Sequence, residues 1–276
     1  MKKNVGSSFS IIDCFNGLET VNAHYVDQHF SKHVHEGYAI GIITNGSQKF
    51  YNLGENHISD KGSLVVINAD TVHTGEPISE TGCSYRAIYP TPDFINGILS
   101  DIPSFRESAP YVNVPVIYNQ EMIYHLSTLF QYLDSDAPKL VIESLIYTFF
   151  IKMVVNFGHK KLPSSEIDAK SNVERVRDYL IEFSNRNIAL EELASVGRVN
   201  KFTLIKQFKQ HWGLTPHQYQ IQLRLHNAKK LLSKGEAPAE VAITCGFYDQ
   251  SHFSSLFKRA MGTTPNQYRL ATKLQR

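Results

Sequence analysis

Three histidines have the residue type, and part of the spacing, that a metal centre needs. His33 and His35 are two residues apart and would share one face of a β-strand, and His73 follows later in the chain. Three imidazoles can hold Zn²⁺ or Fe²⁺ and leave one coordination position open. The sequence has neither a nucleophile elbow nor a phosphate-binding loop. We therefore do not expect an enzyme, and we expect no cofactor.

A second chemistry is suggested by the charges. Residues 171–276 contain 16 Lys and Arg against 8 Asp and Glu, whereas residues 1–170 contain 12 against 18. This asymmetry is typical of a nucleic-acid-binding module attached to an acidic body, although random drift of surface charge explains it about as well. The three distant cysteines suit a reducing cytoplasm, and no run of apolar residues is long enough to predict a membrane span. No signal peptide is expected either.

The elements that would position these residues fall into two groups. Strand-like segments at residues 38–44, 48–52, 64–68 and 83–89, separated by turn residues, predict a sandwich or small barrel. Two helices are expected over residues 120–133 and 139–157. The second helix is apolar on more than one side, so it packs either against the barrel alone or also across a dimer seam.

An internal repeat occupies the last part of the chain. Residues 208–219 and 257–268 share the pattern F-K-x-x-x-G-x-T-P-x-Q-Y at a separation of 49 residues. In each copy the glycine is expected to end a helix and the Thr-Pro pair to begin the next. Upstream of each copy the pattern predicts a short helix, a sharp turn and a second helix, capped by Asn200 or by Asp249. The sequence therefore predicts two helix-turn-helix units, joined by a long helix over about residues 216–233.

Residues 173–270 resemble the DNA-binding domain of the AraC/XylS family of bacterial transcriptional regulators. The likeness is densest over residues 242–258 and continues through Gly262, Thr264-Pro265 and Tyr268-Arg269. The resemblance implies that the second helix of each unit enters a major groove, about one turn (~34 Å) from the other. The positions that it places against DNA are Lys201, Phe202, Ile205, Lys206, Lys209, Gln250, Ser251, His252 and Ser255. For any single one, contact with phosphate or with solvent remains as good an interpretation as base readout.

Lys206 is the strongest candidate for a base contact, since lysine can approach guanine, and Gln250 can form two hydrogen bonds to adenine. The chain departs from the family pattern twice. Its first turn glycine comes one position early, at Gly197, which leaves Arg198 where glycine is usual. Ser255 stands where many members have arginine, so the second unit is expected to contact mainly the DNA backbone.

Residues 30–38 and 62–73 are similar to the two cupin motifs, which implies a β-barrel with a central cavity. In cupin enzymes such motifs supply metal ligands, so His33, His35 and His73 are weak candidates for a metal site; the carboxylate ligand has no clear match. In AraC-type sensors the barrel mostly binds a small effector without metal. The effector-binding candidates are His35, Tyr38, His73, Arg86 and Tyr89. Plain structural histidines are the remaining interpretation.

The predicted fold class is thus α+β multidomain, with a cupin-like barrel and two flanking helices followed by an all-α domain of two helix-turn-helix units. Its expected parts are an effector-binding and dimerisation domain (1–157), a linker (158–171) and a DNA-binding domain (172–276). The expected function is sequence-specific transcriptional regulation, controlled by an effector, in the bacterial cytoplasm at the nucleoid. The expected partners are promoter DNA, a small molecule, a second copy of the chain and, for an activator, RNA polymerase, with no membrane. The alternative is a metal-dependent cupin enzyme with an appended helical domain.

Overall fold

The computed structural model describes residues 6–12, 17–100, 110–159 and 167–273 of the chain. The chain divides into two compact units, one built mainly from residues 1–30 and 35–162 and the other from residues 163–274 together with 31–34. Residues 30–33 form a strand that pairs within the sheet of the first unit, so they are described with that unit. Each unit is described by itself.

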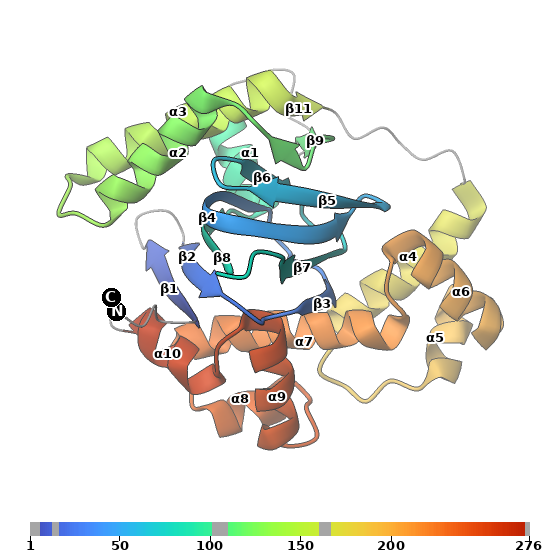
Figure 1. Cartoon of the computed structure of the whole chain (residues 1–276). Helices are drawn as coiled ribbons and strands as arrows, with labels where there is room; N and C mark the ends of the chain where they lie inside the picture. Colours follow the sequence, from blue (N-terminus) through green and yellow to red (C-terminus); the bar gives the residue numbers. More distant parts are fainter. Residues whose placement is uncertain (1–5, 13–16, 101–109, 160–166, 274–276) are drawn as a thin grey trace. The chain divides into compact units, whose positions relative to one another are not determined.

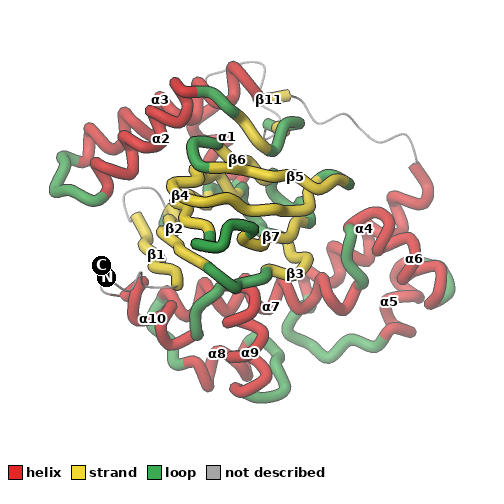
Figure 2. The backbone as a smooth tube through the Cα atoms, in the orientation of Figure 1, coloured by secondary structure: helices red, strands yellow, loops and turns green. Residues whose placement is uncertain are grey.

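The first unit is an antiparallel β-sheet of nine strands with helices packed on one face (Figures 1 and 2). Along the main path the order is β1-β2-β8-β4-β6-β10, with β5 and β7 paired to β4 and β3 paired to β7. The strands are β1 (Gly6–Ile12), β2 (Leu18–Tyr25), β3 (Phe30–His33), β4 (Ala39–Asn52), β5 (Glu55–Asp60), β6 (Leu64–Ile67), β7 (His73–Pro77), β8 (Cys83–Tyr89) and β10 (Val116–Ile117). A separate two-stranded sheet pairs β9 (Tyr111–Val112) with β11 (Gly158–His159).

The long strand β4 gives the sheet its curvature. A register shift between Ile43 and Asn45 marks a bulge, and bulges bend and twist a strand. Before the shift β4 pairs with β6, and beyond it β4 pairs with β5 and β7, whereas β8 pairs with it on both sides of the bulge. One strand therefore serves two parts of the sheet, as the predicted barrel requires.

Successive residues of the strands pack on opposite faces of this sheet. Leu64, Val66 and Ile88 belong to the main apolar cluster, which they share with the helices. Val65 and Ile67 belong to a second cluster on the other face, with Phe50 and Cys83. The core is therefore on both sides of the sheet, and the face away from the helices is the inside of the predicted barrel.

Three helices cover the outer face: α1 (Pro92–Leu99), α2 (Gln120–Leu133) and α3 (Lys139–Phe157). The bounds of α2 and α3 are those predicted from the sequence. Helix α3 buries Ile146, Phe149, Phe150, Met153 and Val154 in the main cluster. By length and composition alone α3 would also pass as a membrane-spanning helix, a feature that the core helices of globular proteins share.

The second unit consists of helices in the described residues: α4 (Ile167–Glu182), α5 (Leu190–Gly197), α6 (Lys201–Trp212), α7 (Pro216–Ser233), α8 (Pro238–Thr244), α9 (Gln250–Met261) and α10 (Pro265–Lys273). Helices α5–α6 and α8–α9 are the two predicted helix-turn-helix units, and α7 is the predicted joining helix. The fold class expected from the sequence is confirmed. The expected linker, residues 158–171, overlaps regular elements at both ends, because Gly158 and His159 form β11 and α4 begins at Ile167. Residues 160–166 lie outside the described residues.

The repeat has the same local structure in both copies. Asn200 and Asp249 accept hydrogen bonds from the backbone N–H groups of Thr203 and His252, which caps α6 and α9. Gly213 and Gly262 end these helices in the left-handed conformation, where glycine carries no steric penalty. In the turn between α5 and α6, Arg198 has a φ of 53°, in the left-handed region. The glycine of this turn comes one position earlier, at Gly197, so a residue with a side chain adopts the left-handed conformation.

Candidate nucleic-acid interface and effector site

Helix α6 buries one side and exposes the other. Leu204 and Phe208 are completely buried, as expected from the repeat. The five residues predicted to contact DNA lie on the exposed side: Lys201, Phe202, Ile205, Lys206 and Lys209. Phe202 is 78% exposed, which is unusual for a phenylalanine that has only a packing role. The spacing of these residues places them on one stripe of the helix, so they can meet one surface together.

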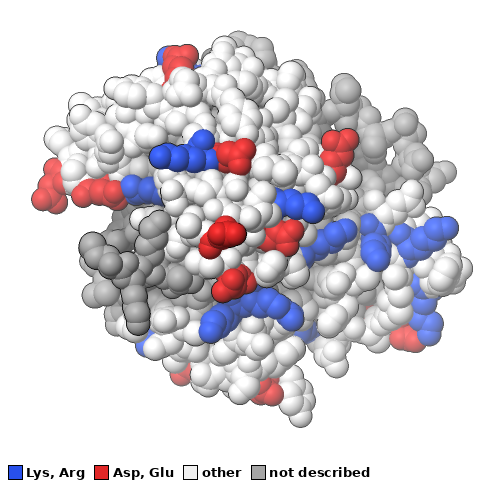
Figure 3. Space-filling model, in the orientation of Figure 1, with Lys and Arg blue, Asp and Glu red and all other residues white. Residues whose placement is uncertain are grey.

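The three lysines of this stripe differ in their surroundings. Lys201 Nζ lies 2.5 Å from Glu191 Oε1, which links α6 to α5 and holds the pKa of the Glu191 carboxyl below its usual value. Lys206 and Lys209 form no ion pair with any residue that the structure describes. Two unengaged ammonium groups on an exposed stripe are suited to phosphate or base contacts. Figure 3 shows Lys and Arg side chains gathered over the helices α4 to α6.

Helix α9 repeats this arrangement with different side chains. Phe253 and Phe257 are completely buried, while Gln250, Ser251, His252 and Ser255 are exposed as predicted. The His252 ring lies 6.2 Å from the ring of Phe247, centroid to centroid, so part of this side chain faces its own turn. The stripe carries the amide of Gln250 and the hydroxyl of Ser255 at the positions where α6 carries Lys201 and Lys206. Contact between either stripe and DNA is a prediction from these positions.

Lys258, an exposed residue of α9, is not among the positions predicted to contact DNA. It lies in the last turn of the helix. The separation of 49 residues makes it the counterpart of Lys209 in α6, and applying the repeat to every position would have found it. Tyr248, which is 93% exposed in the turn before α9, was also missed, and no sequence signal distinguishes it.

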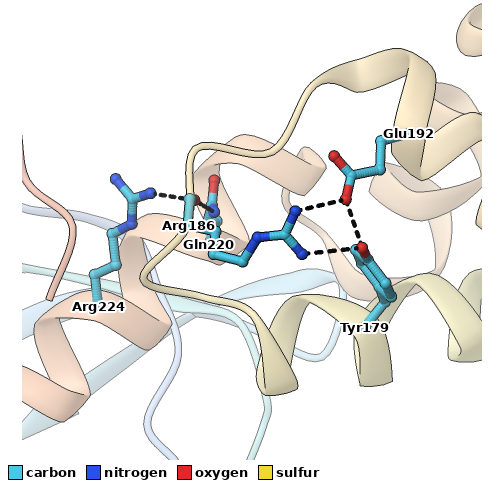
Figure 4. A network of polar contacts seen from close by, with 5 residues as sticks. All are labelled: Tyr179, Arg186, Glu192, Gln220 and Arg224. Carbon is cyan, nitrogen blue, oxygen red and sulfur yellow. Dashed lines mark hydrogen bonds and ion pairs between the residues drawn. The ribbon is translucent and has the colours of Figure 1, made fainter.

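The first helix-turn-helix unit, α5–α6, is held in place by a polar network, which Figure 4 shows from close by. Tyr179 of α4 donates a hydrogen bond of 2.5 Å to Glu192 of α5, and this carboxylate also pairs with Arg186. From α7, Gln220 and Arg224 donate to the backbone carbonyl of Arg186, at 2.9 and 2.8 Å.

Gln220 and Arg224 also donate to the carbonyl of Ser184, at 3.1 and 2.7 Å. These carbonyls lie in the segment that follows α4, so the two α7 side chains satisfy backbone acceptors outside the helix. The bonds fix the segment after α4 to the joining helix.

In the first unit of the chain, three of the predicted effector-binding residues lie together. The ring centroids of His35 and His73 are 4.9 Å apart, and those of His35 and Tyr89 are 5.2 Å apart. His33 joins them, since one ligand atom from each of His33, His35 and His73 lies within 4.8 Å of the others. Burial lowers the pKa of the His33 imidazole and raises that of the Tyr89 hydroxyl, so both side chains are held neutral near pH 7.

Two of the predicted effector-binding residues lie elsewhere. On β8, Arg86 alternates with Tyr85 and Tyr89 and points to the helix side, where its guanidinium stacks over Phe130 and makes two hydrogen bonds to Asp134, of 2.6 and 2.9 Å. Tyr38 is part of the cluster shared with the helices, and its hydroxyl donates to the carbonyl of Pro110. The structure therefore does not group Arg86 and Tyr38 with the histidines, because neighbouring residues of a strand face opposite ways. Tyr85, whose burial raises its pKa, is on the inner face instead and was not predicted.

Comparison with known proteins connects both sites to one class of protein. A family model described as an AraC-like ligand-binding domain matches residues 15–150, and a helix-turn-helix domain model matches residues 193–271. The chain is 29% identical over 225 residues, 82% of each sequence, to the uncharacterized HTH-type transcriptional regulator YbfI of Bacillus subtilis. It is 26% identical over 248 residues, 87% of each sequence, to the HTH-type transcriptional activator RhaS of Klebsiella pneumoniae.

Among solved structures, the fold is similar to ToxT from Vibrio cholerae. The TM-score is 0.60 at 17% identity, over 92% of this chain and 98% of that one. A second ToxT structure, bound to an unsaturated fatty acid, gives 0.58 at 18% identity over 98% of both chains. The two family models together match most of the chain, and the relatives are transcriptional regulators. The chain belongs to the AraC/XylS family of DNA-binding transcriptional regulators.

Proposed function

We propose that this regulator reads promoter DNA with the exposed stripes of α6 and α9 and responds to a small molecule bound on the inner face of its β-sheet. The observation that carries the proposal is the duplicated unit, in which two helices with equivalent caps and an equivalent buried phenylalanine each present an exposed stripe. A reading helix must expose its contact residues while its opposite side is anchored in a core, and both helices do so. We also propose that the protein works in the bacterial cytoplasm, at the nucleoid, and catalyses no reaction.

The DNA-binding part is tested by Lys206→Ala, measured by fluorescence anisotropy on a duplex that the protein itself selects from a random pool. Because Lys206 is exposed and unpaired among the described residues, its loss should weaken binding by about 1–3 kcal/mol. Lys234→Ala removes the same charge outside the two reading helices, at the end of α7, and should leave the affinity close to wild type.

The same measurement separates base readout from phosphate contact. If Lys206 reads a base, the variant should lose discrimination at one position of the duplex. If Lys206 contacts only phosphate, binding should weaken equally for all duplexes and the dependence of log K on log salt should become shallower by about one. Equal affinities of Lys206→Ala and wild type would remove Lys206 from the interface.

The effector site is proposed around His35, His73 and Tyr89, the predicted residues that lie together. Support comes from their position on the inner face of the sheet and from the match of residues 15–150 to a ligand-binding domain. Arg86 is left out, because its guanidinium is already paired with Asp134.

We further propose that the protein is a homodimer through α3 and its neighbour α2. A stripe of exposed apolar residues runs along α3 at helical spacing, comprising Leu140, Tyr147, Ile151 and Val155. Tyr124 of α2 is exposed as well, and α2 and α3 lie side by side in Figures 1 and 2. Contiguous exposed apolar surface of this kind is typical of an interface. If the regulator is an activator, RNA polymerase is a further partner.

Val155→Glu should weaken the dimer, because the new carboxylate would be buried in the interface without a partner. We expect the dissociation constant from sedimentation equilibrium to rise at least about tenfold, equivalent to about 1.4 kcal/mol. Ile58→Glu is the matched control, since Ile58 is an exposed apolar residue of β5, away from these helices. A wild-type chain that stays monomeric at micromolar concentration would contradict the proposal, as would an unchanged constant in Val155→Glu.

A further inference from the structure

The three histidines on and beside β3 and β7 are arranged as metal ligands rather than as isolated core side chains. One ring nitrogen from each of His33, His35 and His73 lies within 4.8 Å of the other two. Zinc–nitrogen bonds of about 2.0–2.1 Å in a tetrahedral site place such nitrogens about 3.4 Å apart. Binding of an ion would therefore draw the three nitrogens closer together than this outer limit.

The hydrogen bonds of two of these histidines orient their rings. Nδ1 of His33 lies 2.8 Å from the carbonyl oxygen of Ser31, and Nδ1 of His73 lies 3.0 Å from that of Thr71. A carbonyl oxygen only accepts, so Nδ1 is the donor in both rings and Nε2 carries the lone pair. Donation from the second ring nitrogen to a backbone carbonyl is the arrangement found behind metal-bound histidines, where it sets the tautomer and the ring orientation.

The type of ion follows from the donor set. Three neutral imidazole nitrogens suit zinc, copper, nickel or ferrous iron, whereas magnesium and calcium require oxygen ligands. Three protein ligands also leave the ion with an open position and its full positive charge. Such an ion can then take water or an anionic group of a small molecule as its fourth ligand.

We propose that His33, His35 and His73 bind a divalent transition-metal ion. This ion is either the effector itself or the group in the site that binds a small-molecule effector. The first half of this inference stands on the histidine geometry alone. The second half rests on the function proposed above, in which the inner face of the sheet controls DNA binding.

The binding test uses the full-length chain, prepared without a polyhistidine tag and treated with a chelator. Isothermal titration with Zn²⁺ should give one ion per chain, and Co²⁺ should give the visible absorption of a tetrahedral site. His35→Gln and His73→Ala should each lower the affinity by at least about 10–100-fold, the loss that removal of even a supporting group causes. His29→Ala is the control, because His29 is an exposed histidine paired with Glu76 and should bind as wild type does.

Far-ultraviolet circular dichroism of each variant identifies a loss caused by misfolding. His35 is only half-buried, so His35→Gln is the variant expected to remain folded. A folded His35→Gln protein that binds Zn²⁺ as tightly as wild type would overturn the site, as would a wild-type chain without stoichiometric binding.

The effector half is tested by measuring affinity for the selected duplex with and without one equivalent of Zn²⁺. We expect the DNA affinity of wild type and His29→Ala to change at least about fivefold and that of His35→Gln to stay constant. A fivefold change is at the lower end of the couplings usually found between two binding sites. Intact Zn²⁺ binding with no change in DNA affinity would overturn the effector assignment. If the protein binds Zn²⁺ but no duplex under any condition, the proposed function fails while the metal site stands.

Discussion

Gly246→Ala is expected to lower the free energy of unfolding of the helical unit by more than about 2 kcal/mol and to abolish tight DNA binding. Gly246 forms the turn between α8 and α9, with a φ of 81° that residues with a side chain rarely adopt. An alanine Cβ there would lie 2.0 Å from the carbonyl oxygen of Asn185. That oxygen has no room to move, since Gln220 and Arg224 hold the carbonyls on either side of it. The turn would have to open, and α9 would lose its position.

The measurement is urea unfolding followed by the fluorescence of Trp212, the single tryptophan of the chain, which lies in α6. Gly54→Ala separates the strained backbone from the collision: Gly54 has a φ of 91°, but a Cβ there meets nothing within 4 Å. Its cost, followed by circular dichroism, should be about 1–2 kcal/mol, the cost of a left-handed residue alone. If Gly246→Ala unfolds at the same urea concentration as wild type, the close approach of Asn185 to the turn is not present in solution.

Phe208→Ala and Phe257→Ala should each destabilise the helical unit by about 3–5 kcal/mol, because each removes a ring from the completely buried side of a reading helix. The two phenylalanines are the counterparts of one another in the repeat. Each packs edge-on against the tyrosine of the following helix, with ring centroids 5.6 Å apart in both copies, Phe208 on Tyr219 and Phe257 on Tyr268. Equal surroundings should give similar losses, which thermal or urea unfolding will measure.

Phe202→Ala is the contrasting variant in the same helix. Phe202 is 78% exposed, so its removal should change the stability of the unit by no more than about 0.5 kcal/mol, while the affinity for DNA should fall. The result that would contradict this division of α6 is a Phe202→Ala protein that unfolds more readily than Phe208→Ala. It would mean that the exposed stripe is part of the core and is not available to DNA.

The pairing of Arg86 with Asp134 leaves the proposed effector site without this guanidinium. An unpaired arginine at an effector site would favour an anionic ligand, because its guanidinium pairs with carboxylates. In the structure the Arg86 guanidinium is paired with Asp134 at the end of α2. A metal ion on the three histidines would supply positive charge for an anionic ligand, and the Zn²⁺ experiments examine this.

The local sequence alone determined the duplicated helical unit. The caps at Asn200, Asp249 and Thr215 follow from residues a few positions apart, and the bounds of α2 and α3 in the other unit follow from the periodicity of their apolar residues. The DNA-facing positions of α6 came from the resemblance to the AraC/XylS family. Such signals lie within one turn of a helix, so they are legible without knowledge of the rest of the chain.

Only the tertiary structure decided which residues of the β-sheet lie together. The face to which a strand residue points depends on how its strand pairs with the neighbouring strands. In β4 this pairing shifts at a bulge that the residue pattern does not predict. This is why Arg86 turned away toward Asp134 and Tyr38 toward Pro110, while His33, His35 and His73 came within reach of one ion. Contacts between strands far apart in sequence depend on register, and a shift of one residue reverses every side chain.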